Sequence, residues 1–189
     1  MKLVKIMAGR FSYFNRKRKL SFALKYIERK GISSILVVGA TPSRSKQSFV
    51  NLIEEGLAKN AGRFVVCGLE SESKDWDTWI QADGLALPFP DKEFDLVFSN
   101  AVIEHVGNES DQLQFIREHS RVGKNWMITT PNRLFPIESH TQILIRHMRK
   151  NWRSPGVTRL LSKRDLQLLI PASSSIKGSP FSPTFIAHS

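Results

Sequence analysis

The sequence predicts an α/β fold, in which a mostly parallel sheet carries helices on both faces. Short runs of apolar, β-branched residues alternate with stretches of helical periodicity, which is the order that builds βαβ units. Three of these runs lead into a glycine or an acidic residue, at Gly39, Glu70 and Asp83. An open parallel sheet presents its ligands at the carboxyl ends of its strands, so these positions are the first candidates for a site.

Length and composition indicate one globular domain. The chain has 189 residues, of which 41% are hydrophobic and 24% are charged. We expect residues 1–31 to form a leading basic helix and residues 32–189 to form the core of the domain. No apolar run approaches the ~18 residues of a membrane-spanning helix. The N-terminus also lacks the long apolar core and cleavage site of a signal peptide, so neither feature is expected.

Cysteine and histidine usage argues against a metal site. Cys67 is the single cysteine, which excludes an intramolecular disulfide and a cysteine-rich metal site. His105, His119 and His140 are isolated from one another and show no spacing typical of metal ligands. No metal is therefore expected, and the composition suits a reducing cytoplasm.

The net charge of +11 needs an explanation. Basic residues gather at residues 16–19 and again at residues 146–153. Such clusters bind nucleic acid, anionic membranes or acidic substrates, but most are simply solvated surface. No RNA-reading sequence motif accompanies them. Nucleic acid is therefore not the favoured partner at this point, and an acidic small molecule remains an option.

The first half of the chain provides two strands and the helices beside them. Residues 11–30 have the apolar spacing of an amphipathic helix that Gly31 ends, and residues 34–39 form a buried strand. A turn and a helix extending to about residue 59 follow. Residues 63–70 form the second strand, and Glu70 at its end is placed to accept hydrogen bonds from the two hydroxyls of a ribose.

The stretch from residue 81 to residue 108 organises the rest of the chain. A short strand over residues 79–82 leads to Asp83, and a proline-rich turn over residues 85–93 is too short for a helix. Residues 94–99, Phe-Asp-Leu-Val-Phe-Ser, form a buried strand. Asn100 follows at its carboxyl end, and Ile-Glu-His-Val comes three residues later.

This stretch, with its Leu-Pro-Phe-Pro-Asp-Lys-Glu-Phe-Asp turn and its Glu-His-Val segment, resembles the class I S-adenosylmethionine-dependent methyltransferases. The likeness is greatest to their small-molecule, type 11-like branch. It implies a Rossmann-like sheet of seven strands, mostly parallel, with an antiparallel last strand. It also implies S-adenosylmethionine as the cofactor, with an aspartate facing the adenine. The residues that it implies for cofactor binding are Gly39, Ala40, Glu70, Asp83, Gly84 and Asn100.

The turn after the first strand departs from the family pattern. The family carries an acidic residue and three glycines there, whereas this chain has Val37 and Val38 before Gly39, and Thr41 and Pro42 after it. Glycines let the backbone approach a ligand, and proline removes a donor and fixes φ. A degenerate loop that serves only the fold is the alternative to a working cofactor site.

The resemblance continues to the end of the chain. Residues 111–121 are predicted to form a helix whose buried stripe includes Phe115, and residues 125–130 form the fifth strand. The resemblance assigns a substrate loop to residues 131–141. A basic helix is expected over residues 142–149, a helix capped by Ser162, and two short antiparallel strands around residues 173–177 and 184–188. Asn132 and Glu138 are the substrate candidates, and ordinary turn-stabilising hydrogen bonds are the competing explanation for both.

His105 and His140 are the candidate catalytic residues, because imidazole titrates near neutral pH and can take a proton from an acceptor. The predicted function is methyl transfer from S-adenosylmethionine to an N, O or C nucleophile of a small molecule. Two alternatives stay open. One is a catalytically degenerate methyltransferase fold that only binds. The other is a nucleic-acid methyltransferase, although the Asn/Asp-Pro-Pro motif of amino-directed enzymes is replaced by Ser-Asn-Ala-Val.

Overall fold

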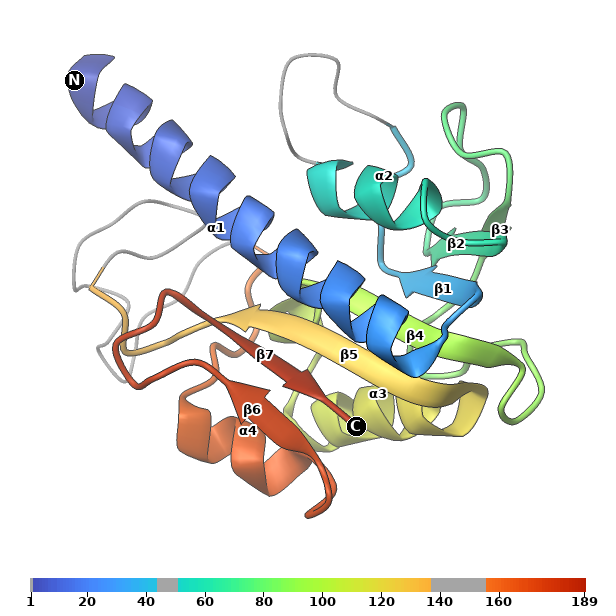
Figure 1. Ribbon diagram of the computed structural model, residues 1–189. Coiled ribbons are helices and arrows are strands. Elements are labelled where there is room, and N and C mark those ends of the chain that lie inside the picture. Colours follow the sequence, from blue (N-terminus) through green and yellow to red (C-terminus); the bar gives the residue numbers. More distant parts are fainter. Residues whose placement is uncertain (1, 44–50, 137–155) are drawn as a thin grey trace.

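The computed structural model describes residues 2–43, 51–136 and 156–189, and in the first helix it describes side chains from residue 10 onward. In this part of the chain, strands join into one seven-stranded sheet with the order β3-β2-β1-β4-β5-β7-β6 (Figure 1). The strands are β1 (Ser34–Val38), β2 (Arg63–Gly68), β3 (Trp79–Gln81), β4 (Phe94–Asn100), β5 (Gly123–Pro131), β6 (Ser175–Lys177) and β7 (Thr184–His188).

Strands β1 to β5 run parallel to one another, and β7 is antiparallel to both β5 and β6. The reversal of order at β1, between β2 and β4, is the switch point at which open α/β sheets bind ligands. The predicted fold class, a Rossmann-like, mostly parallel seven-stranded sheet with an antiparallel last strand and helices on both faces, is confirmed.

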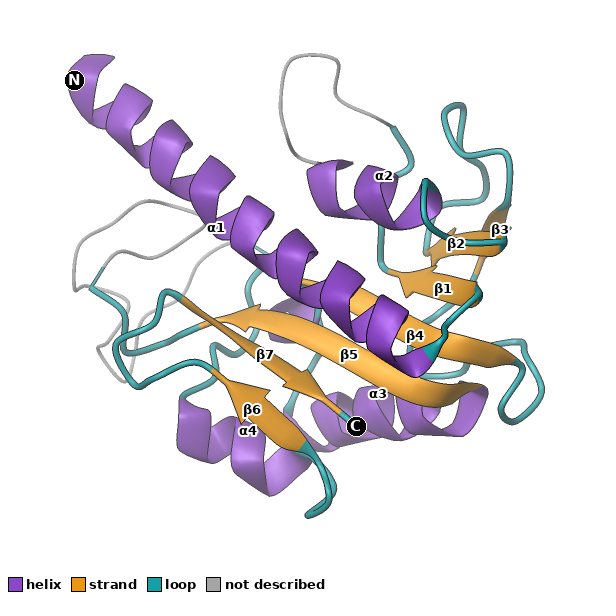
Figure 2. Ribbon diagram, in the orientation of Figure 1, coloured by secondary structure: helices purple, strands orange, loops and turns teal. Residues whose placement is uncertain are grey.

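Helices cover both faces of the sheet (Figure 2). Helices α1 (Lys2–Lys30) and α2 (Leu52–Ala58) lie on one face, where Tyr26 and Ile53 join the sheet residues Phe98 and Met127 in a buried cluster. Helices α3 (Glu109–Val122) and α4 (Lys163–Leu169) cover the opposite face, around Phe115. Central strands that are apolar on both faces are the sequence signature of this arrangement.

Local capping chemistry sets the helix ends. Asn108 and Asp111 form a capping box at the start of α3, and Ser162 and Asp165 form another at the start of α4, as expected of Ser162. Gly31 ends α1 as predicted, in the left-handed conformation with φ +63°. The predicted helix over residues 142–149 lies outside the described residues. None of the described helices has the length and apolar composition that a membrane span requires.

Candidate functional site

A cavity of about 390 Å³ lies at the carboxyl ends of β1, β2, β3 and β4. This volume is within the range of small-molecule sites in proteins. Five of the six residues predicted for cofactor binding line it, and Asn100 is the exception. The lining consists of Val38, Gly39, Ala40, Thr41, Gly68, Leu69, Glu70, Ala82, Asp83, Gly84, Ala101, Val102, His105, Val106 and Phe115.

The two carboxylates of the site come from neighbouring strand ends. Glu70 follows β2, and the Trp79 indole donates a hydrogen bond of 3.0 Å to its backbone oxygen, which ties the turn to β3. Asp83 follows β3, and its Oδ1 accepts a bond of 2.9 Å from the Leu85 backbone N–H. Both residues are exposed at the wall of the same cavity. The topology therefore brings together two acids that lie thirteen positions apart in the sequence.

At two glycines in the cavity wall, Gly39 and Gly84, the neighbouring side chains leave no room for a Cβ. Gly39 has φ +76°, and a Cβ there would lie 2.7 Å from the Val102 side chain. At Gly84 a Cβ would lie 2.6 Å from the ring of Phe115. Real Cβ atoms do not approach so closely, so a side chain at either position would push apart the walls of the cavity.

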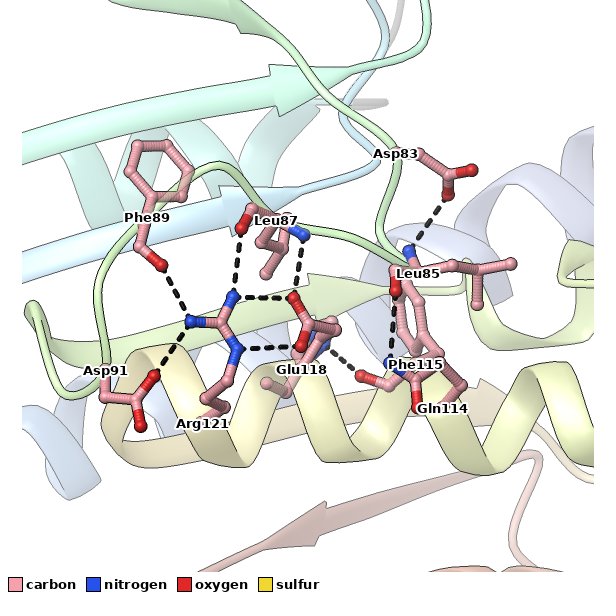
Figure 3. Close-up of polar contacts among 10 residues, drawn as sticks. Asp83, Leu85, Leu87, Phe89, Asp91, Gln114, Phe115, Glu118 and Arg121 are labelled. Atoms are coloured by element: carbon pink, nitrogen blue, oxygen red, sulfur yellow. Dashed lines mark hydrogen bonds and ion pairs between the residues drawn. The ribbon is translucent and has the colours of Figure 1, made fainter.

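The turn that carries Asp83 is held on α3 by one arginine (Figure 3). Arg121 donates to the backbone oxygens of Leu87 and Phe89, at 2.9 and 2.8 Å, and pairs with Asp91 at 2.9 Å. Its Nε and Nη2 donate to both oxygens of Glu118, at 2.8 and 2.7 Å. The guanidinium thus replaces the helix that is absent between β3 and β4.

Glu118 completes this arginine clamp. Its Oε2 accepts a hydrogen bond of 2.8 Å from the Leu87 backbone N–H, and the side chain is only 9% exposed. The hydrogen bonds from Arg121 lower the pKa of Glu118 below its ordinary value. Gln114 adds a bond of 3.2 Å to the Leu85 carbonyl, so both ends of the turn are fixed to one helix.

His105 lines the cavity from the short 3-10 helix Ile103–His105 after β4. Its Nδ1 lies 2.5 Å from the backbone oxygen of Gly156. Since a carbonyl only accepts, Nδ1 donates a hydrogen in this contact. Glu104 takes no part in the cavity: it is fully buried, and its Oε2 accepts a bond of 3.3 Å from Thr130.

Asn100 does not line the cavity. Its Oδ1 accepts hydrogen bonds of 2.6 Å from Lys19 and 2.8 Å from Thr129, and its Nδ2 donates to Glu54 at 3.2 Å. Asn100, the last residue of β4, points to the α1/α2 face, whereas Ala101 follows the strand with φ +57° and reaches the site. Burial lowers the pKa of Lys19 to about 8 within this cluster.

Asn132 also lies outside the cavity lining, and its side chain makes hydrogen bonds within the fold. Its Nδ2 donates to the backbone oxygens of Pro180 and Ser182, at 2.7 and 2.8 Å, and its Oδ1 accepts from Leu134 at 2.9 Å. The side chain is 3% exposed, so it serves as the turn-stabilising group that was the competing explanation. Glu138 and His140 lie outside the described residues, and their roles stay predictions.

Several lining residues were not singled out in the sequence. Leu69, Val102 and Val106 give the cavity apolar walls, and Leu69 is 70% exposed there. Phe115 was predicted only as part of the buried stripe of α3, yet its ring closes the cavity beneath Gly84. The available signal was position, because each of the first three lies within a few residues of a strand end.

Comparisons with known proteins agree with this geometry. A family model described as a methyltransferase domain matches residues 56–125. Among solved structures, a methyltransferase from Clostridium acetobutylicum superposes with a TM-score of 0.63 at 10% identity, covering 91% of this chain and 90% of that one. The YcgJ protein from Bacillus subtilis gives 0.61 at 18% identity, covering 85% and 70%. No curated protein matches the sequence.

A third structure, a methyltransferase from Archaeoglobus fulgidus, gives a TM-score of 0.60 at 13% identity and covers 92% of this chain and 93% of that one. At these identities the structures support the fold. Together with the family model, they confirm the resemblance to class I S-adenosylmethionine-dependent methyltransferases that the motifs indicate. That family implies S-adenosylmethionine as the cofactor.

Proposed function

We propose that this chain moves a methyl group from S-adenosylmethionine to a nucleophilic N, O or C of a small-molecule acceptor. One observation carries the proposal. The turns after β1, β2 and β3 line a single cavity, and Glu70 and Asp83 both stand in its wall. Had the two acids faced different sides of the molecule, only the fold would support a methyltransferase.

The lining residues match the parts of the cofactor in chemical type. A carboxylate accepts several hydrogen bonds, which suits Glu70 for the ribose hydroxyls and Asp83 for the adenine amino group. The backbone N–H groups of Gly84 and Ala40 lie in the same lining and are the candidate donors, since the Gly39 N–H is bonded to the Cys67 carbonyl. The apolar walls of Leu69, Val102 and Phe115 suit a flat aromatic base.

The chemistry asks little of the protein beyond positioning. When bound, the cofactor supplies a methyl carbon made electrophilic by its sulfonium. The chain must hold the acceptor in line with that carbon, and good alignment alone contributes a large share of the rate. Where the acceptor must lose a proton, we assign His105 as the base, since it lines the cavity and the Gly156 carbonyl fixes its ring through Nδ1.

The unusual turn after β1 is the observation that favours the alternative, a fold that binds without catalysis. In place of glycines, the turn is braced from outside: the Trp76 indole donates 3.0 Å to the Thr41 carbonyl, and the Ser73 hydroxyl donates to the Pro42 carbonyl. These bonds give the turn a defined shape without a glycine-rich sequence. The shape is compatible with both candidates, so ligand binding decides between them.

Isothermal titration with S-adenosylhomocysteine tests the cofactor site. We expect binding with a Kd below millimolar, weakened roughly tenfold or more in Asp83→Ala because a charged hydrogen bond is lost. Asp77→Ala is the matched control, since Asp77 is an exposed aspartate outside the cavity. Wild-type protein without heat of binding at millimolar ligand would refute the proposal and favour the degenerate fold.

His105 is tested by turnover, followed as release of S-adenosylhomocysteine with a panel of small-molecule acceptors. For an acceptor that must lose a proton, His105→Gln should lower kcat by about 10²-fold or more. Its affinity for S-adenosylhomocysteine should stay within a few-fold of wild type. Equal turnover of the two proteins over the whole pH range would remove His105 from the reaction.

A further inference from the structure

Helix α1 carries far more positive charge than solubility requires. It holds ten lysines and arginines and a single acid, Glu28. Its inner side is already used, because Ala23, Tyr26 and Ile27 are buried against the sheet. What remains is the side that faces solvent, and Figure 1 shows the first half of the helix reaching beyond the strands.

One stripe of this helix faces outward along its whole described length. Arg10, Phe14, Lys17, Ser21 and Lys25 recur at helical spacing, and all five are exposed; we call them the α1 outer face. At 1.5 Å per residue the stripe is about 22 Å long. Phe14 stands among the cations with 63% of its surface exposed. Its ring makes an edge contact with Tyr13, with centroids 6.0 Å apart, and the exposed remainder is available for stacking.

A groove of about 900 Å³ continues the stripe beside α1. Lys17, Ser21 and Lys25 line it together with the apolar side chains of Leu20 and Leu24, and Glu28 is its acidic member. Cations along a rim and apolar surface below are what a nucleic-acid strand requires, because its phosphates need positive charge and its bases need flat apolar contacts.

We propose that the α1 outer face and this groove bind single-stranded nucleic acid. The cations Arg10, Lys17 and Lys25 contact phosphates, and the ring of Phe14 stacks on an unpaired base. Base stacking on an aromatic side chain needs no particular sequence, so the absence of an RNA-reading motif is no obstacle. The proposal does not depend on the cavity transferring methyl groups.

An anionic membrane is the competing partner, and the structure disfavours it. Helices that lie in a membrane interface insert a continuous apolar face, with their charges on the other side. From residue 10 onward, where the side chains of α1 are described, Ala23, Tyr26 and Ile27 are buried in the protein, and of the outer face only Phe14 is apolar. The neighbouring Phe11 stacks on Phe135, with ring centroids 5.8 Å apart, so it is held by the protein.

The test uses the whole chain and fluorescent poly-uridine RNA and poly-thymidine DNA strands of about 12 nucleotides. Affinity is measured between about 50 and 200 mM salt. Reversing Arg10, Lys17 and Lys25 to glutamate should weaken binding more than tenfold and reduce the logarithmic salt slope by about 2, since each single-strand phosphate contact contributes about 0.7. The control triple Lys74→Glu, Arg117→Glu and Arg164→Glu changes net charge equally, at exposed residues away from α1.

Phe14 separates stacking from membrane insertion. Phe14→Ala and Phe14→Leu should both weaken strand binding roughly tenfold, and Phe14→Trp should retain it. RNA-only binding or binding of both strands supports the proposal and identifies the natural polymer. Equal losses in the outer-face triple and the control triple would overturn it. Binding to phosphatidylserine vesicles that survives Phe14→Leu, without binding to either strand, would assign the face to membranes instead.

A titration with S-adenosylhomocysteine accompanies every variant. None of the outer-face residues lines the cavity at the carboxyl ends of the strands. The cofactor affinity of the outer-face variants should therefore equal that of wild type. A failure of the cofactor site and a failure of the α1 outer face are then seen as separate results.

Discussion

His119 shows how burial controls a single titratable group. It is fully buried on α3, its Nδ1 donates 2.8 Å to the Phe115 carbonyl, and its Nε2 has no hydrogen-bond partner among the described residues. Burial lowers the pKa of His119 to about 4, from an ordinary value of 6.5, and the hydrogen bond to Phe115 and the nearby Glu118 only partly oppose this. The folded protein therefore holds this imidazole in its neutral form.

The lowered pKa predicts a pH-dependent stability. Between about pH 6.5 and 4 the unfolded chain binds a proton that the folded chain refuses, so stability falls as pH falls. We expect a loss of about 3 kcal/mol over this window that His119→Leu does not share. Urea unfolding of both proteins across the window measures it. Parallel pH profiles for the two proteins would contradict the assignment.

At the scale of elements, the connection between β3 and β4 depends on α3. A βα unit usually fixes such a crossover with a helix of its own, but here Arg121 and Glu118 hold the turn through its backbone oxygens and one N–H. The turn positions Asp83 in the cavity. Arg121, a residue of α3 that does not line the cavity, thus holds the turn next to Asp83.

Removing this arginine clamp should cost stability. Arg121→Met leaves the nearly buried Glu118 carboxylate without its cation, and because Arg121 is itself 33% exposed we expect a loss of only about 2 kcal/mol. Arg121→Lys should fall between, since lysine cannot form the planar fork. Urea unfolding measures all three. The control Arg117→Met, on the exposed side of α3, should change stability by under about 0.5 kcal/mol.

If Arg121→Met proves as stable as Arg117→Met, the Arg121 contacts drawn in Figure 3 make no net contribution to the stability of the fold. If the clamp also positions Asp83, Arg121→Met should bind S-adenosylhomocysteine several-fold more weakly than the control. The binding readout distinguishes support of the site from support of the fold.

At the scale of the whole molecule, the last residue of the chain contacts the C-terminal half of helix α1. The Tyr26 hydroxyl of α1 donates 2.6 Å to the Ser189 carbonyl, next to β7. Helix α1 also shares a buried cluster with β1, β4, β5 and β7. We propose on this basis that residues 1–189 form one cooperative domain, with residues 1–31 as its leading helix.

Calorimetry tests this proposal. We expect a single transition whose calorimetric and van't Hoff enthalpies agree. S-adenosylhomocysteine at about 100 times its Kd should raise the Tm by roughly 5–10 °C, as mass action adds about 2.7 kcal/mol. Two transitions, the first insensitive to ligand, would show that α1 unfolds separately from the sheet.

The sequence by itself determined the order of the elements and the acids of the site. Short apolar, β-branched runs predict buried strands, and the carboxyl ends of neighbouring parallel strands lie at one edge of the sheet. Local sequence signals were therefore enough to predict that Gly39, Glu70 and Asp83 line one cavity. Ser162 and Gly31 marked helix ends for the same reason, because caps act over only a few residues.

Only the tertiary structure decided which face of the sheet each side chain met. Asn100 and Ala101 are neighbours in the sequence, yet one bonds to Lys19 beneath α1 and the other lines the cavity. Asn132 bonds to a turn some fifty residues away. Likewise, only the tertiary structure shows which side of α1 is buried against the sheet and which side faces solvent. Each outcome depends on contacts between distant segments, which no local pattern of residues encodes.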